Sequence, residues 1–368
     1  MIEDHNLNIP EQDYRDMDIP SYSLLSSISK HGVDVLSGVK GNFFQLKFGS
    51  LVDDLCFEPS NLVNYYEAKG VKSITGNPKV IIDSILDSIA DVSVGQKAPV
   101  KQGLIPMRSP KKKVVSNSIS DYRTEIISTA RLLGVYKNYN DDKIFNTIIG
   151  KSDNINYFAD KINSRGKVHI KPEMWQMAID AADTLKTHEF TRIYFDDTPG
   201  MQLIYQYKFV QKVNGYDVKG MLDCLVIDHD NKTIYPVDLK TGEDSVENFD
   251  EVMLLHKYYL QASLYRSAIK AIVAKDPDLK GYGVSNFEFV YLSKMNIFKP
   301  LIWVVPQTLH KAGWDGFTDR FGFKHKGLTE LLEAYEYSKA NALCQYVETD
   351  YENDGRKFLS NLIKIEEE

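Results

Sequence analysis

Three β-rich runs in the second half of the chain, separated by tight turns, constrain the fold more than any other feature of the sequence. The runs with strand character are 202–213, 218–227 and 233–239. The dipeptide Asn214-Gly215 between the first two favours a two-residue hairpin turn, and the polar segment HDNK precedes the third. A helical pattern and two later strands follow at 254–273, 286–292 and 301–305. This order predicts an α/β (α+β) fold in which helices flank a mixed central β-sheet.

Two acidic residues and a lysine lie within these strands. Asp223 stands among apolar neighbours in the second strand, where a carboxylate is costly to bury without a cation or a hydrogen-bond donor. Asp238 and Lys240 end the third strand and, two residues apart, point to the same face. The turn at 229–232 folds the third strand against the second, so the two carboxylates can approach each other. With the carbonyl of Leu239 they would form a hard-oxygen site for a divalent cation beside an ammonium group.

A buried aspartate–lysine ion pair at a strand end is the structural alternative. The tripeptide D-x-K is common, and taken alone it favours this ion pair. The longer arrangement is much rarer: it combines G-x-x-D in a strand, a short turn, a strand ending in D-L-K-T-G, and a helix with Gln261 and Tyr265 at positions i and i+4. The combination favours a cation site.

The segments GMLDCLVID, IYPVDLKTG and YYLQASLY resemble the RecB-like and lambda-exonuclease-like branch of the PD-(D/E)xK nuclease superfamily. The phage-encoded relatives of exodeoxyribonuclease VIII are the most similar members. The resemblance covers about residues 20–60 and 170–305, because SYSLLSSISK is similar to the family's serine-rich opening helix and FGSLVDDLCFEP to its G-T-x-V-H-x-L segment. It implies a restriction-endonuclease-like core with a helical insertion, and a deoxyribonuclease that depends on Mg²⁺ or Mn²⁺.

The resemblance also implies roles for single residues. Asp223, Asp238 and the carbonyl of Leu239 would ligate one or two metal ions, and Lys240 would orient or deprotonate the attacking water. The helix motif Q-x-x-x-Y would support the site and the DNA. Its residues, with the aromatic residue that precedes them, are Gln261, Tyr265 and Tyr258.

The sequence departs from the family at two positions. The family's histidine aligns with Asp53, which could bind a metal or a metal-bound water, or lie on a helix surface. An upstream glutamate of the family falls near Gln202 or Gln206, neither of which is an anionic ligand. These departures leave open whether the site holds one metal ion or two.

Charge and cysteine content narrow the class further. The chain has 44 basic and 51 acidic residues, a net charge of −7, which argues against coating nucleic acid through bulk charge but allows a local grip on DNA. The basic candidates for DNA contact are Lys257 and, in an exposed loop at 95–118, Lys111, Lys112 and Lys113. The alternative interpretation of the three loop lysines is a solvated surface loop without a DNA contact. Three scattered cysteines exclude the four-cysteine iron–sulfur subtype, so no iron–sulfur cluster is expected.

The domain organisation is expected to be simple. A flexible, acidic and polar N-terminal arm at 1–20, without secretory character, would precede a single nuclease domain at 21–345 with an insertion at about 70–165, and 346–368 would form a C-terminal helix or tail. Further helical patterns lie at 21–38, 49–57, 78–92, 121–135, 141–149, 172–187 and 328–345. No apolar run approaches the roughly 18 residues of a membrane span, so a cytoplasmic protein is expected, in the host cytoplasm if it is phage-encoded.

The function expected from these features is a metal-dependent DNA exonuclease that acts on duplex ends in phage-type recombination or DNA processing. We expect a homo-oligomer, with a single-strand annealing or recombination protein as partner. A structure-specific endonuclease on the same core is one alternative. A catalytically degenerate DNA-binding or assembly protein is the other, motivated by Asp53 and by Gln202 or Gln206. The sequence leaves cleavage polarity and the choice between DNA and RNA open.

Overall fold

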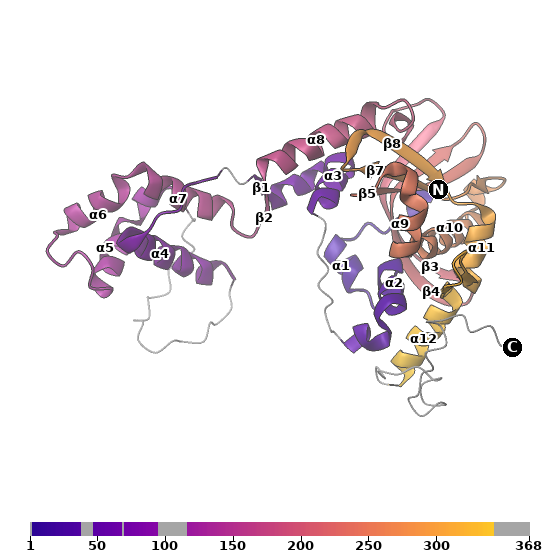
Figure 1. Cartoon of the computed structure of the whole chain (residues 1–368), viewed down its shortest axis with the longest axis horizontal. Helices are drawn as coiled ribbons and strands as arrows, with labels where there is room; N and C mark the ends of the chain where they lie inside the picture. The colour runs from indigo at the N-terminus through magenta and orange to yellow at the C-terminus, as the bar shows by residue number, and fades with distance from the viewer. Residues whose placement is uncertain (1, 38–46, 68–69, 95–115, 342–368) are drawn as a thin grey trace. The chain divides into compact units, whose positions relative to one another are not determined.

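The computed structural model describes residues 2–37, 47–67, 70–94 and 116–341 (Figure 1). They belong to two compact units. The first combines the chain up to residue 59 with the chain from residue 177 onward, and the second spans 60–176. The insertion is therefore a unit of its own and extends beyond 70–165 at both ends. Within the described residues, no helix combines the length and apolar character needed to cross a membrane.

A mixed six-stranded sheet forms the centre of the first unit. Its strands are β3 (Met201–Val213), β4 (Tyr216–Asp228), β5 (Thr233–Gly242), β6 (Gly283–Val284), β7 (Glu288–Ser293) and β8 (Asn296–Val304). The order is β3-β4-β5-β7-β8, and β6 pairs with the start of β5. Neighbours run antiparallel except at the β5–β7 and β5–β6 pairs, which are parallel. The predicted mixed sheet flanked by helices is confirmed.

Turn chemistry fixes the register of the first hairpin. Asn214 and Gly215 have φ values of 50° and 93°, the left-handed conformations that a two-residue turn between twisted strands requires. The pairing of Val213 with Tyr216 closes the hairpin directly beside them. The sequence signal and the observed turn therefore coincide.

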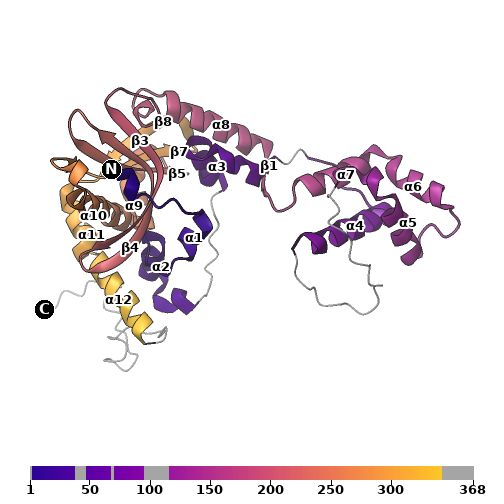
Figure 2. The same cartoon turned by 180° about the vertical axis from the view of Figure 1, so that it is seen from behind.

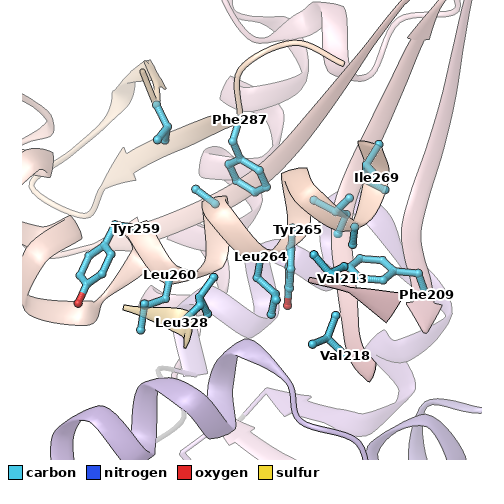
Figure 3. Packing of buried hydrophobic residues seen from close by; sticks show 14 of the residues in the cluster. Phe209, Val213, Val218, Tyr259, Leu260, Leu264, Tyr265, Ile269, Phe287 and Leu328 are labelled. Atoms are coloured by element: carbon cyan, nitrogen blue, oxygen red, sulfur yellow. The ribbon is translucent and has the colours of Figure 1, made fainter. Parts of the chain in front are cut away.

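Apolar helices of the first unit pack on the sheet and on one another. They are α9 (Phe249–His256), α10 (Tyr258–Lys275), α11 (Gln307–Asp315) and α12 (Leu328–Ala340), together with α2 (Tyr22–His31). Helix α10 contacts β3, β5 and β6, whereas α11 packs on α10, and α12 packs on α11 and α2. Helices α10 and α11 lie side by side, and α10 is buried on nearly all sides (Figure 1). Figure 3 shows its Leu264 and Tyr265 packed with Phe209 and Val213 of the sheet.

The single long helix expected at 254–273 is in fact two helices. Lys257 adopts φ 63° and ψ 31°, which ends α9 and starts α10. A left-handed residue other than glycine or asparagine leaves little trace in the sequence, so the apolar periodicity continued across the break.

Helix α3 (Lys47–Phe57) packs against β5. It lies beside the later part of α8 (Pro172–Thr187) (Figures 1 and 2). The ammonium group of Lys186 donates a hydrogen bond of 2.8 Å to the carbonyl of Leu55. A Cβ at Gly49 would lie 2.7 Å from Oγ1 of Thr241. The glycine therefore allows α3 to approach the D-L-K-T-G end of β5.

The N-terminal residues are folded, unlike the flexible arm that was expected. Short helices form at Ile2–His5 (η1) and Glu11–Asp16 (α1), and Ile2 is only 2% exposed. The buried Lys219 of β4 donates hydrogen bonds of 2.9, 2.9 and 2.7 Å to the carbonyls of Tyr14, Arg15 and Met17. The polar composition hid this packing, because a few apolar side chains and one lysine from a distant strand hold the segment.

Replacing Lys219 by Met is expected to destabilise the protein by about 2 to 3 kcal/mol, since three carbonyls at the end of α1 lose their shared donor. Urea unfolding measures the loss, and limited proteolysis should begin at the N-terminal segment. Lys212→Met, at an exposed position of β3, is the matched control and should leave the unfolding free energy unchanged. Equal stability of the two variants would contradict this account of the N-terminal segment.

The second unit is helical. Its helices are α4 (Gly76–Val94), α5 (Arg123–Leu132), α6 (Asp141–Ile149) and α7 (Ser152–Asn163), and its strands β1 (Tyr65–Glu67) and β2 (Val168–Ile170) pair in parallel. An isoleucine-rich core of its own holds the helices together. The helices predicted at 78–92, 121–135 and 141–149 are present, whereas α7 was missed. Lys111, Lys112 and Lys113, like the segment 346–368, lie outside the described residues.

Candidate active site

The predicted acidic residues meet where β4 and β5 part. Paired positions between the two strands run from Asp228–Thr233 to Cys224–Val237. Immediately beyond, Oδ2 of Asp223 accepts a hydrogen bond of 2.8 Å from the backbone N–H of Leu239. The carboxylate of Asp223 thus accepts the hydrogen bond in place of a backbone carbonyl of β4. This contact brings Asp223 next to the D-L-K segment of β5.

Asp238 is held by two donors. It is 2% exposed, and its Oδ1 accepts a hydrogen bond of 2.8 Å from Nε2 of Gln261 on α10. Its Oδ2 accepts a hydrogen bond from the ammonium group of Lys240. Nζ of Lys240 also lies 4.9 Å from the ring centre of Tyr258, a cation–π contact. Sheet alternation places Asp238 and Lys240 together, and α10 supplies the second donor.

The site is not closed to solvent. The side chain of Lys240 is 18% exposed, against 3% for Asp238. Asp223 and Asp53 are half-buried. Asp238 is therefore the buried acidic residue of the site, whereas Lys240, Asp223 and Asp53 are more accessible to solvent.

Three carboxyl groups share the site with one ammonium group, and burial favours the protonated form of these acids. Burial raises the pKa of Asp223 to about 7, and the charge of Asp238 adds to this effect. Burial, followed by the charge of Asp223, also raises the pKa of Asp53 well above its usual value. The pKa of Lys240 is lowered by burial, but Asp238 and other neighbours outweigh this and leave it well above the usual value. One ammonium group faces three carboxyl groups, which is an environment suited to a further cation.

Gln206 is the second departure from the family pattern, and it lies at the site. In the register of β3 and β4 it stands opposite Asp223, between the pairs Tyr205–Cys224 and Tyr207–Leu222. Its φ of 49° is strained for a residue with a side chain, and its side chain forms a hydrogen bond with Asp223. Strain of this kind collects at functional sites.

Gln202, the other candidate for that position, lies elsewhere. Its Nε2 donates a hydrogen bond of 2.6 Å to Glu3 in an exposed setting. Of the two glutamines that the sequence left open, Gln206 is the one that contacts Asp223.

The donors fit a hard divalent cation. Asp223, Asp238 and the carbonyl of Leu239 offer oxygen atoms only, the preference of Mg²⁺ and Mn²⁺. Oε1 of Gln261 is buried and has no hydrogen-bond partner within the described part of the chain, so a polar or ionic partner is missing beside Asp238. Among residues 2–37, 47–67, 70–94 and 116–341, no group of three or more His, Cys, Asp or Glu side chains is placed to hold a metal ion. Two carboxylates and a carbonyl are the set to consider.

Tyr265 packs in the core, and the support of the site and the DNA that the resemblance implied for it stays a prediction. It is 5% exposed, and its ring lies 5.5 Å from that of Phe209 and 6.4 Å from that of Phe287 (Figure 3). A Cβ on Gly220 would lie 2.7 Å from the Tyr265 ring and 2.3 Å from that of Phe209. The glycine of G-x-x-D is thus the space that lets α10 pack on the sheet, and Tyr265 has a packing role.

Gly220→Ala should therefore cost about 2 kcal/mol in unfolding free energy, since the added methyl group overlaps two buried rings. Gly283→Ala is the matched control: a Cβ there meets nothing within 4 Å. Thermal and urea unfolding of the two variants give the comparison. An unchanged midpoint for Gly220→Ala would remove this explanation of the motif.

The other predicted contact residues divide. Tyr258 lines the site over Lys240 and stacks on His256, with ring centres 5.4 Å apart. Nζ of Lys257 lies 3.2 Å from Nδ1 of His325, and its contact with DNA stays a prediction.

An aromatic wall beside Asp223 was missed by the sequence analysis. Phe57, Tyr194 and Phe195 border a cavity of about 10 Å³ that also touches Asp223 and Leu239, room for about one water molecule. Abundant aromatic residues in strands and turns carry no signal for such a place, because packing explains most of them.

Fold and site together define an α+β protein with a mixed sheet and a carboxylate–lysine centre at the divergence of two strands. No family model matches the sequence, and no curated protein matches it either. Among solved structures, a "Putative exonuclease" from Eubacterium rectale is similar over 64% of this chain and 81% of that chain, with a TM-score of 0.33 and 12% identity. At this distance the likeness assigns neither a family nor an activity to the chain.

Proposed function

We propose that the first unit is a metal-dependent nuclease that hydrolyses phosphodiester bonds in DNA. The observation that carries the proposal is the joint position of Asp223, Asp238 and Lys240, with the Leu239 N–H fixing one carboxylate and Gln261 the other. A simple structural ion pair needs one carboxylate. Two further half-buried carboxyl groups with raised pKa values, Asp223 and Asp53, support a centre that binds a cation.

The chain's residues would divide the work. Asp223, Asp238 and the Leu239 carbonyl would hold Mg²⁺ or Mn²⁺, and Asp53 is the candidate for binding a metal-bound water. When bound, the ion supplies a nucleophilic water and positive charge at the scissile phosphate. Lys240 keeps its proton at neutral pH because its pKa is raised, which favours stabilising phosphate charge over removing a proton from water.

The finer assignment rests on the family resemblance. We infer that the substrate is a duplex DNA end, and that the enzyme acts as an exonuclease in phage-type recombination or DNA processing, as a homo-oligomer with an annealing protein as partner. The endonuclease alternative uses the same centre. The non-catalytic alternative is weakened by the complete Asp223, Asp238 and Lys240 set.

Incubation with linear and closed circular duplex DNA, with Mg²⁺ and with EDTA, tests the proposal. We expect digestion of the linear form only, and only with the metal. Cutting of the closed circle would favour the endonuclease. Absence of metal-dependent cleavage, combined with absence of Mg²⁺ and Mn²⁺ binding by calorimetry, would refute the nuclease proposal altogether.

A further inference from the structure

A short hairpin near the end of the first unit holds two aromatic rings in solvent. Strands β9 (Phe317–Thr318) and β10 (Lys324–His325) pair antiparallel and enclose the turn Asp-Arg-Phe-Gly-Phe. Phe321 is 64% exposed and Phe323 62% exposed. Isolated exposed apolar residues are ordinary, but two phenylalanines on one five-residue turn are not explained by the core.

The turn is rigid although its rings are exposed. Oδ1 of Asp319 accepts hydrogen bonds of 2.9 Å from the backbone N–H groups of both Phe321 and Phe323. Its Oδ2 lies 2.8 Å from Nε2 of His325, and these two side chains are only 10% and 9% exposed. The His325 ring stacks on Phe317 with centres 4.8 Å apart. Asp319 and His325 therefore hold the backbone that carries both phenylalanines. This lowers the conformational entropy lost when the two rings contact a ligand.

Basic residues lie close to the rings in the sequence. Arg320 lies over the Phe321 ring, 4.8 Å from its centre, Lys324 stands in β10, and Lys326 follows that strand. The one acidic residue between 317 and 326, Asp319, is engaged inside the turn. In the sequence of this segment, cations therefore outnumber carboxylates, although the whole chain has a net charge of −7.

Two of these basic side chains form ion pairs with exposed carboxylates, and such pairs can exchange partners. Arg320 lies 3.8 Å from Glu251, and Lys326 lies 2.7 Å from Glu330, with all four side chains more than half exposed. Such exposed pairs contribute little and are screened by salt. Phosphate groups can therefore replace them.

We propose that this hairpin binds an unpaired segment of nucleic acid, with bases stacked on Phe321 and Phe323 and phosphates near Arg320 and Lys324. Alternating rings and cations match the two parts of a single strand, whose bases are accessible only when unpaired. A protein partner would use the rings but has no general need for the flanking cations.

The hairpin is connected to the candidate active site through α10. Lys257 contacts His325 at the base of the hairpin, and the next residue, Tyr258, lies over Lys240. The inference rests on the proposed function for its purpose, since it names the form of substrate that would be led to that site. Binding itself requires no cleavage, so the two can be tested apart.

Fluorescence anisotropy of labelled oligonucleotides of about 16 residues, with the full chain in EDTA, is the direct test. The double variant Phe321→Leu/Phe323→Leu keeps apolar bulk but removes stacking, and it should bind oligo-dT at least about fivefold more weakly. Phe321→Tyr/Phe323→Tyr should bind like the wild type. Phe298→Leu, at a phenylalanine of β8 that is 67% exposed, is the matched control and should change nothing. An oligo-U arm shows whether DNA or RNA is preferred.

Three results would overturn the inference. They are absence of oligonucleotide binding by the wild type, equal binding by the leucine double variant, and a change of its oligomeric state in size-exclusion chromatography in place of a change in binding. Metal-dependent cleavage and Mg²⁺ binding, measured on the same protein preparations in buffer without EDTA, report on the proposed nuclease separately. Phe-dependent binding without cleavage and without metal binding would uphold the hairpin and refute the nuclease, whereas cleavage with Phe-independent binding would do the reverse.

Discussion

Asp238→Asn is expected to lower metal-dependent cleavage of linear DNA more than about a hundredfold. The change removes one anionic oxygen from the proposed ligand set, yet the amide oxygen can still accept the hydrogen bond from Gln261. The fold should therefore remain, and the loss should lie in metal affinity and turnover. Initial rates over a series of Mg²⁺ concentrations, together with calorimetric titration of the metal, separate these two effects.

Asp217→Asn is the matched control for this experiment, because Asp217 is exposed on the same sheet, near the far end of β4. It should cleave at the wild-type rate. Full activity of Asp238→Asn would show that the pair with Lys240 is a structural ion pair and that the catalytic centre lies elsewhere.

Lys240→Met is expected to lose both activity and stability. Without the ammonium group, the carboxylate of Asp238 stays 2% exposed with only Gln261 as donor, and breaking a buried pair in this way costs about 3 kcal/mol. The double variant Asp238→Asn/Lys240→Met removes both charges and should recover most of the unfolding free energy while staying inactive. Urea unfolding of the four proteins in this double-mutant cycle gives the coupling.

The stability loss of Lys240→Met should depend on pH in a defined direction. Burial raises the pKa of Asp238 in the wild type, and Lys240 counters this shift. Without the ammonium group the pKa should rise further, so the folded variant would hold a proton that the unfolded chain releases above about pH 4. Stability then decreases as the pH rises, and the deficit relative to the wild type should be larger at about pH 8 than at about pH 5. A deficit that is constant over this range, or that persists in the double variant, would mean that lost packing of the lysine stem is responsible.

The sheet and the centre of the site were accessible to sequence reasoning because they depend on local rules. Strand alternation puts Asp238 and Lys240 on one face, and Asn214-Gly215 fixes the first hairpin. These rules need only neighbours in the sequence. They were enough to place a carboxylate of β4 beside the D-L-K segment of β5.

What could not be predicted depends on contacts between distant segments or on rare backbone conformations. The N-terminal segment is held by Lys219, some two hundred positions away in the sequence. Lys257, which ends α9, and Gln206, within β3, have positive φ values although neither is a glycine or asparagine. Tyr265 fitted a helix motif at the right spacing, but the side on which its ring packs is decided by the space above Gly220.

The parallel ladder between β1 and β2 has a consequence for how such a chain can be rearranged. It pairs Tyr65 with Val168 and Glu67 with Ile170, so the chain enters and leaves the helical unit at adjacent strands. A segment with adjacent ends can be excised, or exchanged for another module, while the host's backbone is rejoined by a short linker. The entropy cost of closing a loop grows only slowly with its length. The stability of the first unit should therefore depend little on the length of the segment inserted there.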